Sequence, residues 1–185
     1  DVLVRVSKTI LEAKALVSIV RPKTHDTVVV TLSIKNVVVG AIMPGYRSRI
    51  HQGYKAINLT LAYLATKMMP NLALIDGYVG MEGNGPVGGE PKPLGLVLIG
   101  SNALETDALT AWLMGFNPND IGYFYYLHRW GYGEITPDKI IVDSSIDWKS
   151  YRTRFKPHRL YLEQLKWRLA PEEERKVERQ LEKNL

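Results

Sequence analysis

The sequence predicts an α/β domain, in which layers of helices cover a largely parallel sheet, followed by a helical tail at the C-terminal end. Short apolar runs of strand length alternate with segments of helical periodicity, which is the pattern of α/β domains. Of the 185 residues, 45% are hydrophobic, which is enough for one sizeable core. We therefore divide the chain into an α/β domain over residues 1–146 and a basic helical tail over residues 147–185.

The first elements include one ambiguous segment. Residues 2–6 alternate like a strand, and Ser7 is placed to cap a short helix that reaches about Ala13. Residues 15–20 form a continuous apolar run, which is typical of a strand buried on both faces. Residues 27–39 fit a strand by their β-branched residues and a helix by their periodicity, so both readings stay open.

The later elements alternate more clearly. In chain order, we expect a helix over 50–68, a buried strand over 71–76, a buried strand over 94–100, a helix over 103–114 capped by Asn102, a helix from Pro118 to about Trp130, and a strand over 139–143. The aromatic run that ends the last of these helices, FYYLHRWGYG, could stack nucleic-acid bases but is more typical of core packing.

The tail is predicted to form one helix after Pro157 and a second from Pro171, which has acidic side chains in its first turn. Residues 151–185 hold ten Lys or Arg against six Asp or Glu, whereas the rest of the chain is nearly neutral. This composition is thermophile-like. The tail could pack on a second subunit or a protein partner, fold on its own domain, or bind nucleic acid, although the neutral body argues against nucleic acid.

Composition excludes several classes of site. The chain has no cysteine, so it cannot form disulfides, bind zinc through thiolates or ligate an iron–sulfur cluster by itself. Its apolar runs are too short and too charged to span a membrane, and we expect a cytoplasmic protein. The chain begins with Asp1 instead of Met, which indicates a fragment or a processed chain.

A glycine-rich segment, MEGNGPVGGEPKP, occupies residues 81–93. Gly83, Gly85 and Gly88 fit the letters of a dinucleotide fingerprint, but the two prolines that follow prevent a helix from starting there, so we predict no NAD site. The segment leaves the end of an apolar strand, where α/β domains place ligands. We predict a ligand-binding loop, and the alternative is a tight structural turn.

Several stretches together resemble the domain of unknown function 362 family: RPKTH and TLSIKN, then RSRIHQG, then IDGYVGMEGNGPVGGEP followed by LGLVLIGSNALETDALTAWLMGFNP. The resemblance covers roughly residues 1–143. It implies that the chain is the carboxyl-terminal two-thirds of a member. Some members are fused to ferredoxin-like modules, so the resemblance also implies an iron–sulfur partner, whose cluster would be ligated outside this chain.

The polar residues at the matched positions are the candidate site. We assign anion capture and proton transfer to Lys23, His25, Lys35 and His51, because amines bind anions and histidine titrates near neutral pH. Ligand-binding candidates are Asn36, Asp76, Glu82, Gly83, Asn84 and Gly85, and the candidates for an unidentified metal are His25, His51 and Glu82. The competing interpretations are a solvated Lys23, histidines satisfied in the core, and a purely structural Asp107 that stabilises the start of its own helix.

The predicted function is a pocket for a small anionic ligand or a metal-bound cofactor, in an enzyme linked to redox metabolism or in a protein without catalytic activity. A lysine buried near Asn36 would have a lowered pKa or pair with a carboxylate. The alternatives are an assembly subunit that uses the basic tail, or a protein associated with nucleic acid or the ribosome. The sequence identifies neither the cofactor nor the substrate.

Overall fold

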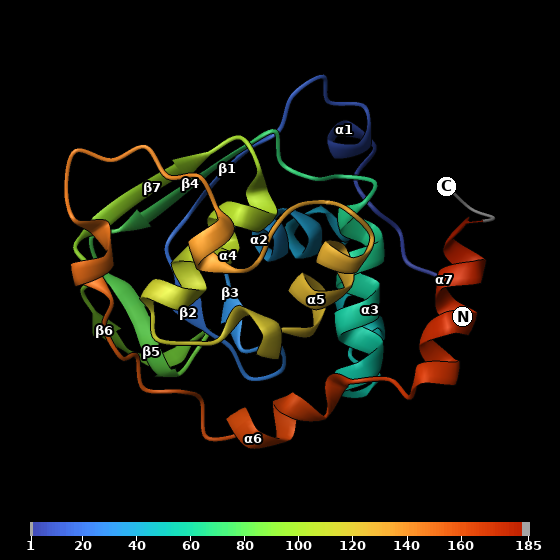
Figure 1. Ribbon diagram of the computed structural model, residues 1–185. Coiled ribbons are helices and arrows are strands. Elements are labelled where there is room, and N and C mark those ends of the chain that lie inside the picture. Colours follow the sequence, from blue (N-terminus) through green and yellow to red (C-terminus); the bar gives the residue numbers. More distant parts are fainter. Residues whose placement is uncertain (1, 183–185) are drawn as a thin grey trace.

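The computed structural model describes residues 2–182, whose elements Figure 1 shows. The strands are β1 (Val17–Val20), β2 (Lys23–Thr24), β3 (Val30–Thr31), β4 (Leu72–Gly77), β5 (Gly80–Asn84), β6 (Gly88–Lys92) and β7 (Leu96–Gly100). The α-helices are α1 (Lys8–Leu11), α2 (Ser33–Ala41), α3 (Gly53–Ala65), α4 (Ala103–Leu113), α5 (Gly122–Arg129), α6 (Tyr161–Gln164) and α7 (Pro171–Glu182). Short 3₁₀ helices lie at Arg47–Ile50, Pro118–Asp120, Pro137–Lys139, Trp148–Tyr151 and Leu165–Trp167.

The strands form two sheets, one in the order β1-β4-β7 and the other in the order β3-β2-β5-β6. These sheets and their helices confirm the α/β class and the helical tail. Parallel pairing is confined to β1 with β4 and β2 with β5, whereas the other pairs are antiparallel. The sheets are therefore mixed, because β7 returns beside β4 directly after the β5–β6 hairpin.

Helices cover the β1-β4-β7 sheet on one side, where Figure 1 shows α2 and α4 beneath it. Burial alternates along β1 and along β4. In β7 the alternate residues Val97 and Ile99 are exposed. Residues 15–20, 71–76 and 94–100 were thus correctly expected to contain strands, but the expected burial on both faces is wrong. A continuous apolar run does not reveal that one of its faces lacks a covering layer.

Other local predictions differ from the structure in identifiable ways. Residues 2–6 form no strand and contribute one isolated bridge, from Val6 to Ile42. The ambiguous 27–39 segment resolves into the short β3 and the helix α2. The strand expected over residues 139–143 is absent: Lys139 ends a 3₁₀ helix, and residues 140–143 run beside β7 without pairing to it.

The predicted glycine-rich loop is instead the β5–β6 hairpin, which pairs with β2. A Cβ atom at Gly85 would lie 2.3 Å from the Thr24 carbonyl oxygen, and one at Gly89 would lie 2.4 Å from the Glu82 carbonyl oxygen. At these positions the glycines are needed because the chain packs closely against itself, which favours the structural-turn alternative over the ligand loop.

The tail folds on its own domain and contributes to the core. Phe155 and Trp167 are buried, and the Trp167 ring lies 5.5 Å from the ring of Tyr126 in α5. The Trp167 indole N–H donates a hydrogen bond of 2.7 Å to the Asp120 carbonyl oxygen. The aromatic run of α5 therefore packs in the core. None of the helices within residues 2–182 has both the length and the apolar character needed to cross a membrane.

Candidate functional site

Five basic side chains from separate parts of the chain form what we call the basic cluster: Lys23, His25, Lys35, His51 and His158. Lys23 lies on β2 and Lys35 in the first turn of α2, whereas His51 follows the 3₁₀ helix at Arg47–Ile50. His25 follows β2, and His158 precedes α6 in the tail. The structure therefore brings together the four residues to which the sequence analysis assigned anion capture and proton transfer.

Lys35 is the most buried amine of the basic cluster, with 7% of its surface exposed. Its amine makes no hydrogen bond and no ion pair with any residue in 2–182. Burial, the first cause, lowers the pKa of Lys35 to about 8, with Lys23 acting in the same direction and Asp26 opposing it. Lys35 is therefore a lysine whose charge is poorly compensated by the protein itself.

His25 is 4% exposed and its ring is neutral at physiological pH. Burial and then the charge of Lys35 lower the pKa of His25 to about 3, and His51 and His158 add to the effect against Asp26. The Thr27 backbone N–H donates to His25 Nδ1 at 3.0 Å, so Nδ1 accepts and the ring proton lies on Nε2. The 2.9 Å contact between Asp26 Oδ1 and Nδ1 is consequently not a charge pair.

The loop that carries His25 and Asp26 is held in a strained conformation. The His25 N–H donates to the Val29 carbonyl oxygen at 2.8 Å, and the Val30 N–H donates to the Val28 carbonyl oxygen at 2.8 Å. Val29, at the centre of this second turn, has a φ of 67°, which is rare for a β-branched residue. Such a residue costs about 1–3 kcal/mol and persists only where its surroundings enforce it.

Gln164 in α6 helps to hold the strained loop in place. Its side-chain amide donates to the His25 carbonyl oxygen at 2.8 Å, and its carbonyl oxygen accepts the Val29 N–H at 2.8 Å. Gln164 is 1% exposed, so both hydrogen bonds are buried. Sequence reasoning missed Gln164, Asp26 and His158, because no local pattern indicates that the tail reaches a loop this far away in the chain.

Asp107 in α4 acts on the helix that carries Lys35. Its carboxylate accepts the Ser33 N–H at 2.9 Å, the Ser33 hydroxyl at 2.6 Å and the Ile34 N–H at 2.9 Å, and so it caps the start of α2. Burial raises the pKa of Asp107 to about 7 against these hydrogen bonds. The expected structural role is therefore correct, but the helix that it stabilises is α2 and not its own.

The polar groups of the β5–β6 hairpin bind the tail. The Glu82 carboxylate accepts the Lys156 N–H at 2.9 Å, and the Asn84 side chain accepts the Arg159 N–H at 3.3 Å. The Gly83 N–H donates to the Lys156 carbonyl oxygen at 2.7 Å. These groups, which we had expected to bind a ligand, fasten residues 156–159 to the hairpin.

Asp76 and Asn36 also have partners within the chain. Asp76 pairs with Arg21 at 3.4 Å and accepts the Tyr78 N–H at 3.2 Å. The Asn36 amide donates to the Ser18 hydroxyl at 3.3 Å.

No metal centre is assembled from the predicted candidates. Among residues 2–182, no group of three or more His, Cys, Asp or Glu side chains is placed to hold a metal ion. His25, His51 and Glu82 therefore do not form the expected set of ligands, and the Glu82 carboxylate is engaged with the tail.

A cavity of about 270 Å³ lies beside β2 and the hairpin, and Lys23 lines it together with Arg21. Its other lining residues are Val79, Gly80, Met81, Gly89 and Pro91. Lys23, whose charge acts on Lys35, thus also lines a space of the size of a small ligand, although Lys35 itself is not among the lining residues.

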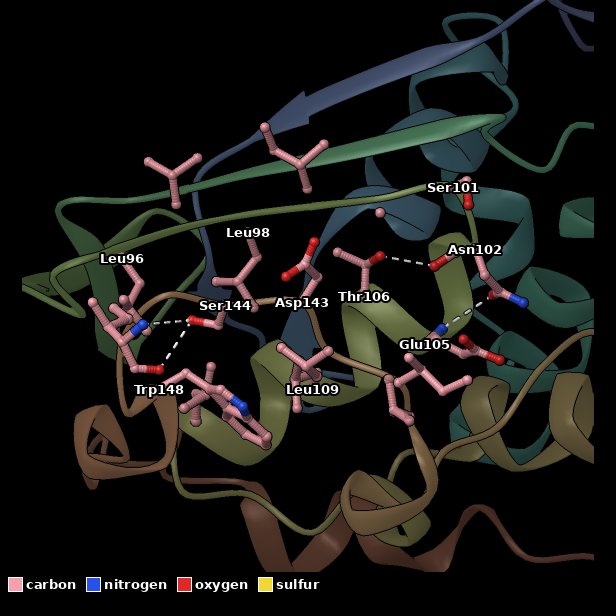
Figure 2. A pocket seen from close by; sticks show the side chains of 18 residues that line it. Leu96, Leu98, Ser101, Asn102, Glu105, Thr106, Leu109, Asp143, Ser144 and Trp148 are labelled. Atoms are coloured by element: carbon pink, nitrogen blue, oxygen red, sulfur yellow. Dashed lines mark hydrogen bonds between the residues drawn. The ribbon is translucent and has the colours of Figure 1, made fainter.

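A larger cavity, of about 430 Å³, lies between β7, α4 and residues 140–148 (Figure 2). It contains none of the predicted site residues, and its described lining has the carboxylates Glu105 and Asp143 but no lysine or arginine. Asn102 at its edge caps α4, accepting the Leu104 and Glu105 N–H groups. The charges of this cavity do not suit an anion.

Comparison with known proteins gives a family and one distant relative. Residues 3–112 match the family described as a domain of unknown function, DUF362. The chain is 24% identical over 157 residues to a thylakoid-associated protein of Synechocystis sp., a match that covers 78% of this chain and 48% of the relative. The chain thus spans about half the length of that curated relative. No solved structure matches it.

Proposed function

This chain belongs to the DUF362 family, and from this premise we propose that it binds a small anionic ligand at the basic cluster. The observation that carries the proposal is Lys35, which is only 7% exposed as a residue and whose amine has no hydrogen bond or ion pair within residues 2–182. An ammonium group on a largely buried side chain loses part of its hydration, and this is costly unless an opposite charge accompanies it. A bound anion supplies that charge.

The surrounding charges favour an anion over a cation. Lys23 acts on Lys35, and Lys35, His51 and His158 act on His25, whereas Asp26 is the acidic group that acts on both. The two amines, Lys23 and Lys35, are the cationic groups, and cationic groups in a low-dielectric environment raise the local concentration of anions. The cavity beside Lys23 and Arg21, at about 270 Å³, suits a ligand of the size of phosphate or a small carboxylic acid.

The pKa values give His25 and Lys35 different roles in the proposed site. A His25 ring with a pKa of about 3 is a weak base, so its role is to donate a hydrogen bond from Nε2–H to the ligand. Lys35, with a pKa of about 8, changes its protonation state close to physiological pH. If the bound anion reacts, Lys35 is the group that gives or takes the proton, and the proton-transfer role that we expected for His25 passes to it.

The test is calorimetric titration of the protein with inorganic phosphate and with malonate. Lys35→Met keeps the volume of the buried stem but removes the charge, so we expect its affinity for both anions to fall by about tenfold or more. The matched control is Lys8→Met, because Lys8 is an exposed lysine whose side chain is 83% accessible, and its affinity should be unchanged.

Two results would contradict the proposal: a wild-type protein that binds neither anion at millimolar concentration, or a Lys35→Met protein that binds them as tightly as the wild type. Thermal melts of both variants, followed by circular dichroism, show whether each one is folded.

A further inference from the structure

One face of the β1-β4-β7 sheet, which we call the outer sheet face, is apolar and exposed. Val17 and Ile19 of β1 are 56% and 67% exposed, and Val97 and Ile99 of β7 are 59% and 63% exposed. On the opposite face α2 and α4 pack against the strands. A sheet with parallel pairing in an α/β protein is ordinarily covered on both faces.

The strand register makes this face continuous. Ile19 pairs with Leu74, and Leu74 pairs with Ile99, so a row of large aliphatic side chains crosses all three strands. Val17 pairs with Leu72 in a second row. A contiguous exposed aliphatic surface, when it is rimmed by polar residues, often marks an interaction site.

We propose that a second copy of this chain packs on the outer sheet face, so that two sheets meet face to face across a two-fold axis. The axis runs along the central strand β4, which sets Leu74 against its own equivalent and the Ile19 edge of one copy over the Ile99 edge of the other. Sheets that pack in this way interdigitate their side chains at a separation of about 10 Å.

Charge at the rim of the face favours a second copy over an anionic lipid surface. Arg21 and Asp76, which pair at 3.4 Å, stand at one end of the face. A two-fold arrangement brings this ion pair against its own equivalent, so each Arg21 finds a second carboxylate and each Asp76 a second guanidinium. An anionic lipid surface would instead meet the carboxylate of Asp76 beside the apolar rows. Arg21 also lines the smaller cavity, but the apolar rows that form this interface contain no residue of the basic cluster.

The competing occupant is a further polypeptide layer. The curated relative has about as much chain outside the matched region as within it, and a segment of that kind could cover the same face. The two occupants differ in what the 185-residue chain does alone, because the second copy predicts self-association and the further layer does not.

Sedimentation velocity over a range from about 5 to about 200 µM tests the proposal. The wild type should sediment as a dimer at the upper end, and the double variant Ile19→Lys, Ile99→Lys as a monomer, with self-association at least about 100-fold weaker. Leu162→Lys is the control, since Leu162 is 75% exposed on α6, away from the sheet, and this variant should remain a dimer.

Ile99→Thr provides a milder change that keeps a β-branched residue in the strand and should weaken the dimer without unfolding it. A wild type that is monomeric at every concentration would overturn the proposal, as would a folded double variant that is still dimeric. A monomer that floats with phosphatidylglycerol vesicles would assign the face to a lipid surface, which also overturns it.

Discussion

Lys35 illustrates how a residue's environment decides its chemistry. The sequence placed a lysine and Asn36 inside an apolar run and predicted either a lowered pKa or a carboxylate partner. In the structure burial lowers the pKa of Lys35 to about 8, and the amine has no ion pair within residues 2–182. The first alternative is therefore the one that the structure supports, and it leaves a charge for a ligand to compensate.

Asp107 was the residue whose partner the sequence could not reveal. Its position in the first turns of α4 indicated a helix-stabilising carboxylate, but its acceptor atoms reach Ser33 and Ile34 at the start of α2. These contacts join residues more than seventy positions apart, which a local pattern cannot show. Asp107 thereby holds in place the turn from which Lys35 projects.

The raised pKa of Asp107 predicts a pH-dependent stability. Because its pKa is about 7 in the folded protein and lower when unfolded, the folded state holds the proton more tightly. The stabilisation from that proton is complete below about pH 4 and is lost as the pH rises through about 7. Asp107→Asn should lower the free energy of unfolding by about 1–3 kcal/mol in acid, and the gap to the wild type should narrow toward neutral pH.

Urea denaturation at several pH values between about 4 and about 8 measures this gap. The matched control is Asp138→Asn, because Asp138 is an exposed carboxylate that pairs with Lys149, and the change should cost less than about 0.5 kcal/mol. If the difference in the free energy of unfolding between the wild type and Asp107→Asn stays constant or widens as the pH rises, the raised pKa of Asp107 is refuted.

At the scale of elements, the glycine-rich segment shows what composition can and cannot indicate. Its glycines correctly indicated close approach of the backbone, but the neighbour is Thr24 of β2 and not a ligand. The Thr24 hydroxyl donates to the Gly83 carbonyl oxygen at 2.9 Å, which fixes the hairpin against β2. Sequence alone could not distinguish a ligand from a neighbouring strand, because both require a missing side chain.

Two substitutions in this hairpin separate packing from ligand binding. Gly85→Ala should destabilise the protein by about 1–3 kcal/mol, because its Cβ would lie 2.3 Å from the Thr24 carbonyl oxygen. Gly88→Ala should change stability by less than about 0.5 kcal/mol, because the nearest atom to its Cβ lies 3.4 Å away. Urea denaturation measures both effects, and equal losses from the two would show that packing against β2 does not explain the glycines.

The strands of the β1-β4-β7 sheet were predicted in position but not in burial. Continuous apolar runs correctly predicted β1, β4 and β7, yet each strand has one face that no helix within residues 2–182 covers. The sequence pattern shows that a strand is apolar, but it does not show whether another layer of the molecule covers each of its faces. The uncovered residues are those that we assign to the dimer interface.

For the whole molecule, the basic cluster depends on distant parts of the chain that fold together. Lys23, His25 and Lys35 lie close in sequence, and they were predicted because they are polar residues within the stretches that resemble the family. His158 and Gln164 come from the tail, which the sequence suggested could be an independent arm. Since Gln164 holds the His25 loop from α6, the tail is part of the structure that builds the site.

The proposed anion site depends on the Lys35 amine, and nuclear magnetic resonance of lysine ε-carbons observes that amine directly. The Lys35→Met variant assigns its signal. A titration of the free protein should give a midpoint near 8, and added inorganic phosphate should raise that midpoint because the anion stabilises the charged amine. A midpoint near the ordinary 10.5 that phosphate does not move would contradict the account.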